Sequence, residues 1–237
     1  MKKALGTMYL LPLPLGSAGI ESLSVTGIQK LSEIDYFIAE RGRTFRRFLK
    51  EIVPETNFEN IEVHEWTKGM VAEEMEPLLQ PLGRGRDVGI VSEAGCPGVA
   101  DPGAMAVQLA HQLNFKVVPV AGPSAILLAL MGSGFNGQNF RFNGYLPREK
   151  NELQNKLVQL ERSVRQSRCT EIFIETPYRN DQLLEAAIQT LHKDTQLVIA
   201  ADLTLPTQWI RRDSIGNWKT KERPNLHKRP AVFLMGS

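Results

Sequence analysis

Residues 90–103 read IVSEAGCPGVADPG, an apolar run that ends in a loop of small residues, prolines and two carboxylates. Small residues in such a loop let the backbone approach a ligand closely. Apolar runs at residues 7–13 and 116–120 end in comparable loops, LPLG at residues 13–16 and AGPS at residues 121–124. Ligands of open α/β sheets bind beyond the carboxyl ends of the strands, so these loops predict a ligand site.

The segments around these loops alternate between strand and helix, which predicts a mostly parallel sheet. Short apolar and β-branched runs favour strands, and apolar residues at helical spacing favour helices between them. The predicted strands are residues 7–13, 35–39, 87–92 and 116–120, and the predicted helices are residues 20–33, 44–52, 71–82, 104–114 and 124–131.

The pattern is looser in the second half of the chain, which predicts a second α/β domain with more antiparallel pairing. Its predicted strands are residues 140–145, 171–174, 196–201, 208–214 and 231–235, and its predicted helices are residues 149–164 and 181–192. Glycines and amides interrupt both periods at residues 132–138, GSGFNGQ. We therefore expect two α/β domains, residues 1–135 and residues 136–237.

The composition is that of an ordinary globular protein. The 237 residues are 42% hydrophobic and 23% charged, which excludes intrinsic disorder as the main state. The net charge of +2 is too small for a polycation, so any nucleic-acid surface requires local clustering of basic residues. The two cysteines, Cys96 and Cys169, match no zinc spacing, and no metal site is expected.

The N-terminal segment has a basic start and an apolar run, as a secretory signal does, but Pro12 and Pro14 interrupt the run. It reads equally well as a short buried strand. Glycines and prolines likewise divide the uncharged residues 117–140 into pieces of strand, turn and helix length. We expect a cytoplasmic protein that does not associate with a membrane.

The first loop contains neither a GxGxxG pattern nor a Walker lysine, which argues against NAD and ATP. Taken together and in order, the loops resemble those of the tetrapyrrole methylase superfamily, the class III S-adenosylmethionine-dependent methyltransferases. Within it they are most similar to the small-subunit ribosomal RNA methyltransferase I group, which methylates a ribose 2′-hydroxyl. The matching stretches are residues 13–16, 92–97, 101–103, 122–125, 142–147 and 175–179.

The resemblance implies the tetrapyrrole methylase fold, two α/β domains with S-adenosyl-L-methionine bound in the cleft between them, and a homodimer. It also implies ribosomal RNA or the small ribosomal subunit as the partner. The residues that the resemblance assigns to the methyl donor are Pro14, Ala94, Gly95, Cys96, Pro97, Asp101, Ser124, Ala125, Gly144, Tyr145 and Pro230.

Methylation of a hydroxyl requires alignment of the reacting atoms and removal of a proton, which a carboxylate or histidine within reach would assist. Glu40, Glu93, Asp101 and Glu175 all follow predicted strands. The predicted catalytic residues are Glu40, Arg43 and Glu175, with Glu40 expected near Arg43 and Glu175 beside Arg179. The alternative for each carboxylate is a helix cap or an ion pair with arginine.

The chain departs from the family pattern at two positions. The group has an acidic residue followed by Asp-Thr-Arg after its second strand, whereas residues 40–44 read ERGRT here. Cys96 stands where a threonine is usual. The missing aspartate leaves open a non-catalytic RNA-binding protein that retains the fold.

A basic face is the remaining clue to the substrate. Arg43, Arg47 and Lys50 fall on one side of a predicted helix whose other side is apolar. Such a face suits RNA phosphates. It would equally suit the carboxylates of a corrin or porphyrin precursor, so methylation of a tetrapyrrole is the alternative enzymatic function, and a solvated surface without a ligand is the third possibility.

Overall fold

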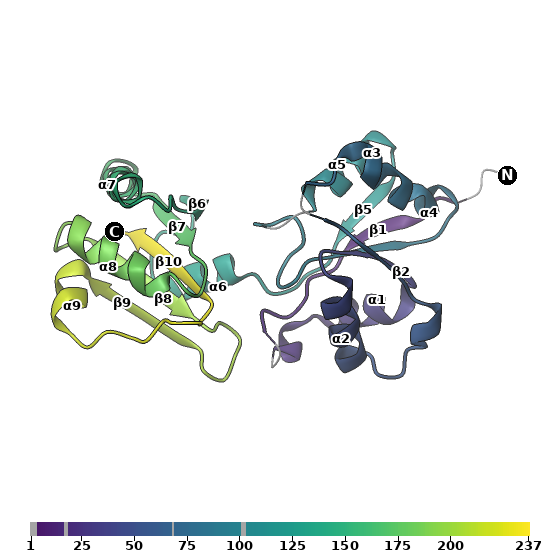
Figure 1. Ribbon diagram of the computed structural model, residues 1–237, viewed down its shortest axis with the longest axis horizontal. Coiled ribbons are helices and arrows are strands. Elements are labelled where there is room, and N and C mark those ends of the chain that lie inside the picture. The colour runs from purple at the N-terminus through teal and green to yellow at the C-terminus, as the bar shows by residue number, and fades with distance from the viewer. Residues whose placement is uncertain (1–3, 17–18, 68, 101–102) are drawn as a thin grey trace. The chain divides into compact units, whose positions relative to one another are not determined.

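The computed structural model describes residues 4–16, 19–67, 69–100 and 103–237 of the chain (Figure 1). The chain divides into two compact units, Met1–Ser124 and Ala125–Ser237. We call them unit 1 and unit 2 and treat each by itself. Each contains one five-stranded sheet.

Unit 1 contains a fully parallel sheet with the strand order β3-β2-β4-β1-β5. Its central strand pairs are in simple register, with Met8 of β1 opposite Val88 of β4 and Val117 of β5. The prediction of a parallel sheet in the first half of the chain is therefore confirmed. The strands are β1 (Thr7–Leu10), β2 (Tyr36–Ala39), β3 (Glu62–Glu65), β4 (Val88–Val91) and β5 (Lys116–Pro119).

Helices cover both faces of this sheet, as Figure 1 shows, because successive side chains of each buried strand point to opposite faces. Phe37 of β2 packs in one apolar cluster with α1 (Val25–Glu33) and α2 (Gly42–Ile52). Ile38 packs in the other cluster, against the helices that follow β3 and β4. These are α3 (Ala72–Met75), η3 (Glu76–Leu79), α4 (Gln80–Gly83) and α5 (Ala104–Gln112); short 3-10 turns are η1 (Ile20–Ser22) and η2 (Phe58–Asn60).

Unit 2 contains a mixed sheet with the order β6-β7-β10-β8-β9. Only β6 and β7 are parallel; β10 is antiparallel to β7 and β8, and β9 is antiparallel to β8. This confirms the expected antiparallel pairing. The strands are β6 (Phe140–Tyr145), β7 (Thr170–Ile174), β8 (Gln196–Ala201), β9 (Trp209–Ser214) and β10 (Ala231–Gly236), and the helices are α6 (Ala125–Ser133), α7 (Lys150–Ser167), α8 (Asn180–Thr190) and α9 (Ile215–Thr220).

One face of this second sheet packs against α7 and α8 in a single apolar core. Leu157 of α7, Leu184 of α8 and Phe233 of β10 are buried in it, and Trp218 of α9 donates a hydrogen bond from its indole to the Leu197 carbonyl at 3.1 Å. Helix α6 contacts β8, β9 and β10. Because α6 packs in unit 2, the division falls at Ser124, earlier than the boundary expected at residues 135 and 136.

Two differences from the predicted elements have physical causes. Strand β3 was not predicted because its sequence, EVHE, carries charge at an edge position where no apolar run is needed. The predicted helix at residues 71–82 is broken into α3, η3 and α4, with Pro77 and Pro81 near the starts of the later two pieces. The short helix α9 was also missed. Within the part of the chain that the structure covers, no helix has the length and apolar character of a membrane span.

Candidate functional site

Three loops of unit 1 meet beyond the carboxyl edge of its sheet. Leu13, after β1, and Gly95, after β4, form a reciprocal backbone pair, with N–H···O distances of 3.0 and 2.9 Å. Gly95 has a φ of +72°, a conformation that glycine adopts without strain. The loops that follow the two adjacent strands β1 and β4 are thus joined directly.

The loop after β5 joins the same cluster. The Cys96 thiol donates to the Pro123 carbonyl at 3.4 Å. Gly122 lies so close to the loop after β1 that a Cβ on it would stand 2.4 Å from the Cβ of Pro12. Burial raises the pKa of the Cys96 thiol, which keeps it a neutral donor. We call these segments, residues 12–14, 92–97 and 121–124, the loop cluster.

The sequence-predicted donor residues of unit 1 fall in this cluster. Pro14, Gly95 and Pro97 are buried, and Ala94, Cys96 and Ser124 are half-buried. Ala125 is the first residue of α6, which belongs to unit 2. The predicted donor residue Asp101 lies outside the described residues. The prediction that these loops gather at one sheet edge is confirmed, whereas their role in binding stays a prediction.

Charged groups flank the cluster at the end of β2. Arg41 extends from backbone in the β conformation, and its Nε lies 2.7 Å from Glu93 Oε1 after the neighbouring strand β4. The expected pairing of Glu40 with Arg43 is wrong. Arg43 lies exposed in the first turn of α2, and within the described residues it forms no ion pair. Because Arg41 precedes the helix, it rather than Arg43 reaches the adjacent strand end.

Glu40 itself has an unusual environment. Its Oε2 atom is buried, yet nothing in the described part of the chain donates a hydrogen bond to it. Buried polar atoms in proteins almost always have a partner, because an unmet one costs free energy. Glu40 directly follows β2, beside the strand that leads into the 92–97 loop. Within the described residues, this oxygen therefore lacks the hydrogen-bond partner that a buried carboxylate oxygen normally has.

Sequence reasoning missed one further carboxylate at this edge. Glu65, at the end of β3, accepts a hydrogen bond on Oε1 from the Gly42 backbone N–H at 2.9 Å, which holds the start of α2 against the sheet. Glu65 could be placed at this edge only if residues 62–65 were predicted as a strand. The sequence pattern that favours a strand there is the alternation of charged residues around Val63, and such a pattern is weak for an edge strand.

The remaining predicted residues gather at one sheet edge of unit 2. Strands β6 and β7 end there and β10 begins there, because Ile174 pairs with both Tyr145 and Val232. Gly144 has a φ of +64° with open space around it, and Tyr145 is 61% exposed. Pro230 immediately precedes β10 and is exposed.

Glu175 follows β7 at this edge, and its side chain is only 5% exposed. Its Oε1 accepts a hydrogen bond from the Thr176 backbone at 2.8 Å. Its Oε2 lies 3.6 Å from Arg179 Nη2, and the same guanidinium nitrogen donates to the Arg148 carbonyl at 3.4 Å. The predicted pairing of Glu175 with Arg179 is thus confirmed, and both carboxylate oxygens have partners, whereas the catalytic role of Glu175 stays a prediction.

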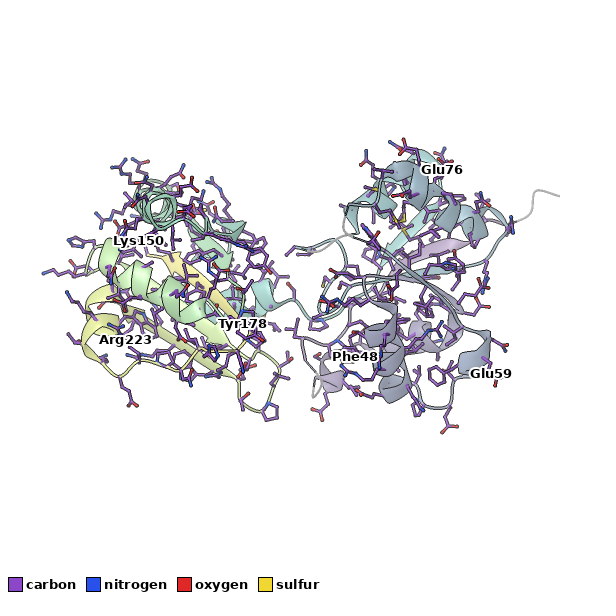
Figure 2. The ribbon with its side chains drawn as sticks, in the orientation of Figure 1. Phe48, Glu59, Glu76, Lys150, Tyr178 and Arg223 are labelled. Carbon is purple, nitrogen blue, oxygen red and sulfur yellow. The ribbon has the colours of Figure 1, made fainter. Side chains whose placement is uncertain are left out.

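Helix α2 bears out the predicted amphipathic pattern. Arg43, Arg47 and Lys50 are exposed, whereas Phe45 and Phe48 are buried against the sheet of unit 1. The Arg47 guanidinium lies 5.7 Å from the centre of the Phe48 ring. We call the three cations the α2 basic face. Figure 2 shows Phe48 on this helix.

Comparison with known proteins gives a consistent result. The tetrapyrrole (corrin/porphyrin) methylase family matches residues 9–218. The chain is similar to the protein named ribosomal RNA small subunit methyltransferase I of Halalkalibacterium halodurans, with 32% identity over 73% of this chain and 56% of that protein. It is likewise similar to the protein of the same name from Bacillus subtilis, with 33% identity over 75% of this chain and 57% of that protein.

The chain thus spans little more than half the length of these curated relatives. Among solved structures, the methyltransferase CobJ aligns with a TM-score of 0.65 and 17% identity over 98% of this chain and 94% of that one. Cobalt precorrin-4 methyltransferase, CbiF, aligns with a TM-score of 0.61 and 16% identity over 97% of this chain and 94% of that one. At these identities, the two alignments show a similarity of fold alone.

Proposed function

Because the chain belongs to the tetrapyrrole methylase family, we propose that it transfers a methyl group from S-adenosyl-L-methionine to a ribose 2′-hydroxyl of small-subunit ribosomal RNA. The names of the curated relatives, at 32% and 33% identity, support the RNA substrate. The unpartnered Glu40 Oε2 beside the loop cluster is the observation in this chain that carries the proposal.

The loop cluster suits a donor that brings its own reactive methyl group. S-adenosylmethionine, when bound, supplies a methyl carbon on a sulfonium sulfur, so the protein's task is alignment. Gly95 and the neighbouring Ala94 carry no bulky side chain, and the positive φ of Gly95 turns the backbone at the point where the loops meet. The backbone N–H and C=O of Gly95 are paired with Leu13, so the N–H groups of Ala94 and Cys96 are the ones assigned to the polar parts of the donor.

We assign to Glu40 the role of general base, which accepts the proton of the ribose hydroxyl. A ribose hydroxyl must lose its proton as the new bond to carbon forms, and a carboxylate within reach assists this transfer. The neighbouring Arg41 is paired with Glu93 rather than with Glu40. Glu40 Oε2 therefore has no hydrogen-bond partner among the described residues. Glu175 is assigned a positioning role, because both its oxygens are already engaged.

The base assignment is tested by Glu40→Gln, which keeps the shape of the side chain and removes its basicity. We expect methyl transfer to fall roughly 100-fold or more, with donor affinity unchanged. A folded variant that retains full transfer would remove Glu40 from the mechanism.

The α2 basic face is assigned to RNA phosphates. Neutralising Arg43, Arg47 and Lys50 to glutamine should weaken RNA binding and lower the slope of log affinity against log salt by about two, since each phosphate contact on a single strand contributes about 0.7. Donor affinity, measured in the same variant, is the internal control. An unchanged slope would leave the face as a solvated surface.

The RNA and tetrapyrrole alternatives are separated by the product. Mass spectrometry of ribosomal RNA from cells with and without the gene should show one 2′-O-methyl group that depends on the protein. Methylation of a corrin or porphyrin precursor by the purified protein, with none on ribosomal subunits, would favour the tetrapyrrole function. Donor binding without transfer to either acceptor would favour a non-catalytic RNA-binding protein.

The assembly and cellular location follow the same reasoning. We propose a homodimer, which is the assembly that the family resemblance implies, and a cytoplasmic location, where ribosomal RNA is available.

A further inference from the structure

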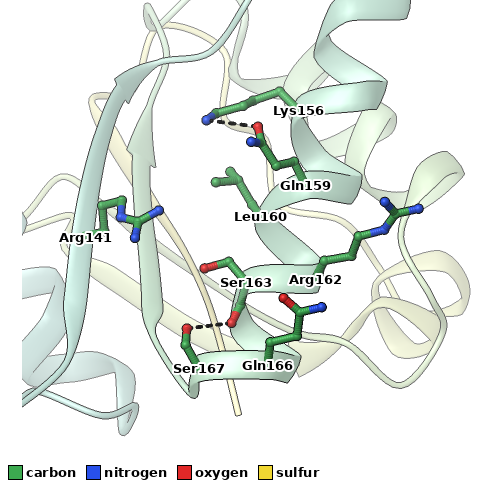
Figure 3. A pocket seen from close by; sticks show the side chains of 8 residues that line it. All are labelled: Arg141, Lys156, Gln159, Leu160, Arg162, Ser163, Gln166 and Ser167. Carbon is green, nitrogen blue, oxygen red and sulfur yellow. Dashed lines mark hydrogen bonds between the residues drawn. The ribbon is translucent and has the colours of Figure 1, made fainter.

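A basic groove lies within unit 2, between the edge strand β6 and helix α7 (Figure 3). It has a volume of about 510 Å³. Arg141 reaches from β6 toward α7, and the helix contributes Lys156, Gln159, Arg162 and Ser163, among others. We call it the α7 groove.

A buried carboxylate fixes the base of the α7 groove. Glu171 of β7 is fully buried; Ser163 donates a hydrogen bond to its Oε1 at 2.5 Å, and Asn143 donates to its Oε2 at 2.8 Å. Arg141 Nη1 is 3.9 Å from Glu171 Oε1, and the Arg141 side chain is 64% exposed. The carboxylate is therefore satisfied mainly by neutral groups, and the guanidinium of Arg141 remains available to a ligand.

The other two cations of the α7 groove have no carboxylate partner in the described ranges. The Lys156 ammonium donates a hydrogen bond to the Gln159 amide oxygen at 3.4 Å, and neither Lys156 nor Arg162 forms an ion pair with a described residue. No acidic side chain is among the residues that line the groove, so Glu171 behind them offsets at most one of three positive charges. Arginine and lysine beside amide and hydroxyl groups are the residues that bind phosphates and sugars of nucleic acids.

We infer that the α7 groove binds the phosphodiester backbone of the RNA on which the protein acts. The inference rests on the proposed RNA substrate. An RNA occupant is favoured because Gly144 and Tyr145 end the same strand that carries Arg141, on the order of 10 Å further along. A chain that presents a nucleotide at that strand end has neighbouring phosphates within reach of the groove. Only Leu160 lines the groove with an apolar side chain, which argues against an apolar ligand.

The test compares two double variants that each remove two positive charges. Arg141→Gln with Lys156→Gln neutralises the cations that face each other across the α7 groove. Lys193→Gln with Lys219→Gln is the control, since both lysines are exposed near α9, which follows β9 at the opposite edge of the sheet from β6. Binding of a fluorescein-labelled uridine 20-mer RNA is measured by fluorescence anisotropy at salt concentrations from about 50 to about 200 mM. In this range counterion release makes the RNA affinity strongly dependent on salt.

We expect the groove variant to lose roughly tenfold in RNA affinity and to lower the salt slope by about 1.4, whereas the control stays within about twofold of the unmodified protein. A second groove variant, Lys156→Gln with Arg162→Gln, keeps Arg141 beside the buried Glu171. It should show the same loss of RNA affinity, which would exclude misfolding of the Arg141 variant as the cause. Equal behaviour of groove and control variants would overturn the inference. Equal weakening of RNA and of a polyglutamate peptide would overturn it as well, because the groove would then bind acidic protein.

Calorimetry of S-adenosylmethionine binding to the same samples separates the two hypotheses. Donor binding with unaltered RNA affinity in the groove variants overturns the α7 groove and leaves the methyltransferase function standing. A specific loss of RNA affinity in a protein that binds no donor supports the groove and contradicts the proposed function.

Discussion

Gly122→Ala is the substitution that most directly tests how the loop cluster is held together. Gly122 follows β5, and a Cβ added to it would lie 2.4 Å from Pro12 Cβ and 2.6 Å from Pro12 Cγ. Ordinary contacts begin near 3.4 Å, so the overlap is about 1 Å. Both neighbours belong to a rigid proline ring, which cannot rotate away. The loops after β1 and β5 must therefore separate.

The expected cost follows from the overlap. Inserting one methyl group into a packed site typically destabilises a protein by about 1–3 kcal/mol. The restriction of the unfolded chain by alanine offsets about 0.4–1 kcal/mol of this. We expect a net loss of about 1–2 kcal/mol in the free energy of unfolding. S-adenosylmethionine affinity should fall as well, because the loops that are forced apart carry the proposed donor contacts.

Gly83→Ala is the matched control in the same unit. A Cβ there meets only Phe115 Cζ at 3.9 Å, and Gly83 closes the short helix α4, where alanine is the better helix former. Its stability should stay constant or rise slightly. Urea unfolding of both variants, with donor titration on each, provides the comparison. Equal stability and equal affinity in the two variants would refute the proposed packing of Gly122 against Pro12.

The other predictions concern charge and assembly. Burial raises the pKa of Asp213, but hydrogen bonds led by that from Arg211 outweigh it and lower the pKa below its ordinary 3.8. This carboxylate therefore stabilises the fold above about pH 4, and the contribution is lost as the pH falls through the lower native value. Asp213→Asn, which also loses the ion pair with Lys221, should cost about 1–3 kcal/mol at pH 7 and much less at pH 2, as measured by urea unfolding; a constant difference would contradict this. Arg41→Met should lower stability by less than about 1 kcal/mol, because the Arg41–Glu93 pair is largely exposed; a larger loss in thermal unfolding would show that the pair holds the sheet edge. Light scattering should give the mass of a dimer, and a monomer at micromolar concentration would reject that assembly alone.

Local sequence patterns predicted most of the fold because buried strands here are short apolar runs. The expected bounds of the buried strand β8 agree with the structure at both ends. Strand β3 was not predictable in the same way, since an edge strand gains its stability from backbone pairing with β2 and needs few apolar side chains. The placement of α6 in unit 2 depends on its packing against β8, β9 and β10, which no local pattern encodes.

The sequence predicted which loops meet at the candidate site, because their position depends on where the strands end. It did not predict which side chains pair there, because that depends on the direction of each side chain. Parallel strands bring their carboxyl ends to one edge, so the loops containing Pro14, Gly95 and Ser124 were expected to meet there. Which arginine reaches which carboxylate depends on the residue at which α2 begins. The structure starts α2 at Gly42, two residues before the sequence prediction, and this leaves Arg41 in extended backbone beside Glu93.

Calorimetric titration of the purified protein with S-adenosylmethionine tests the central claim most directly. We predict saturable binding to the unmodified protein and to the Gly83→Ala control. Gly95→Leu should bind much more weakly, since a leucine side chain would enter a backbone position with φ +72° that already lies against Leu15 and Pro123. Saturation by NAD or ATP with no heat from S-adenosylmethionine, or unchanged donor affinity in a folded Gly95→Leu variant, would contradict the assignment of the loop cluster as the methyl-donor site.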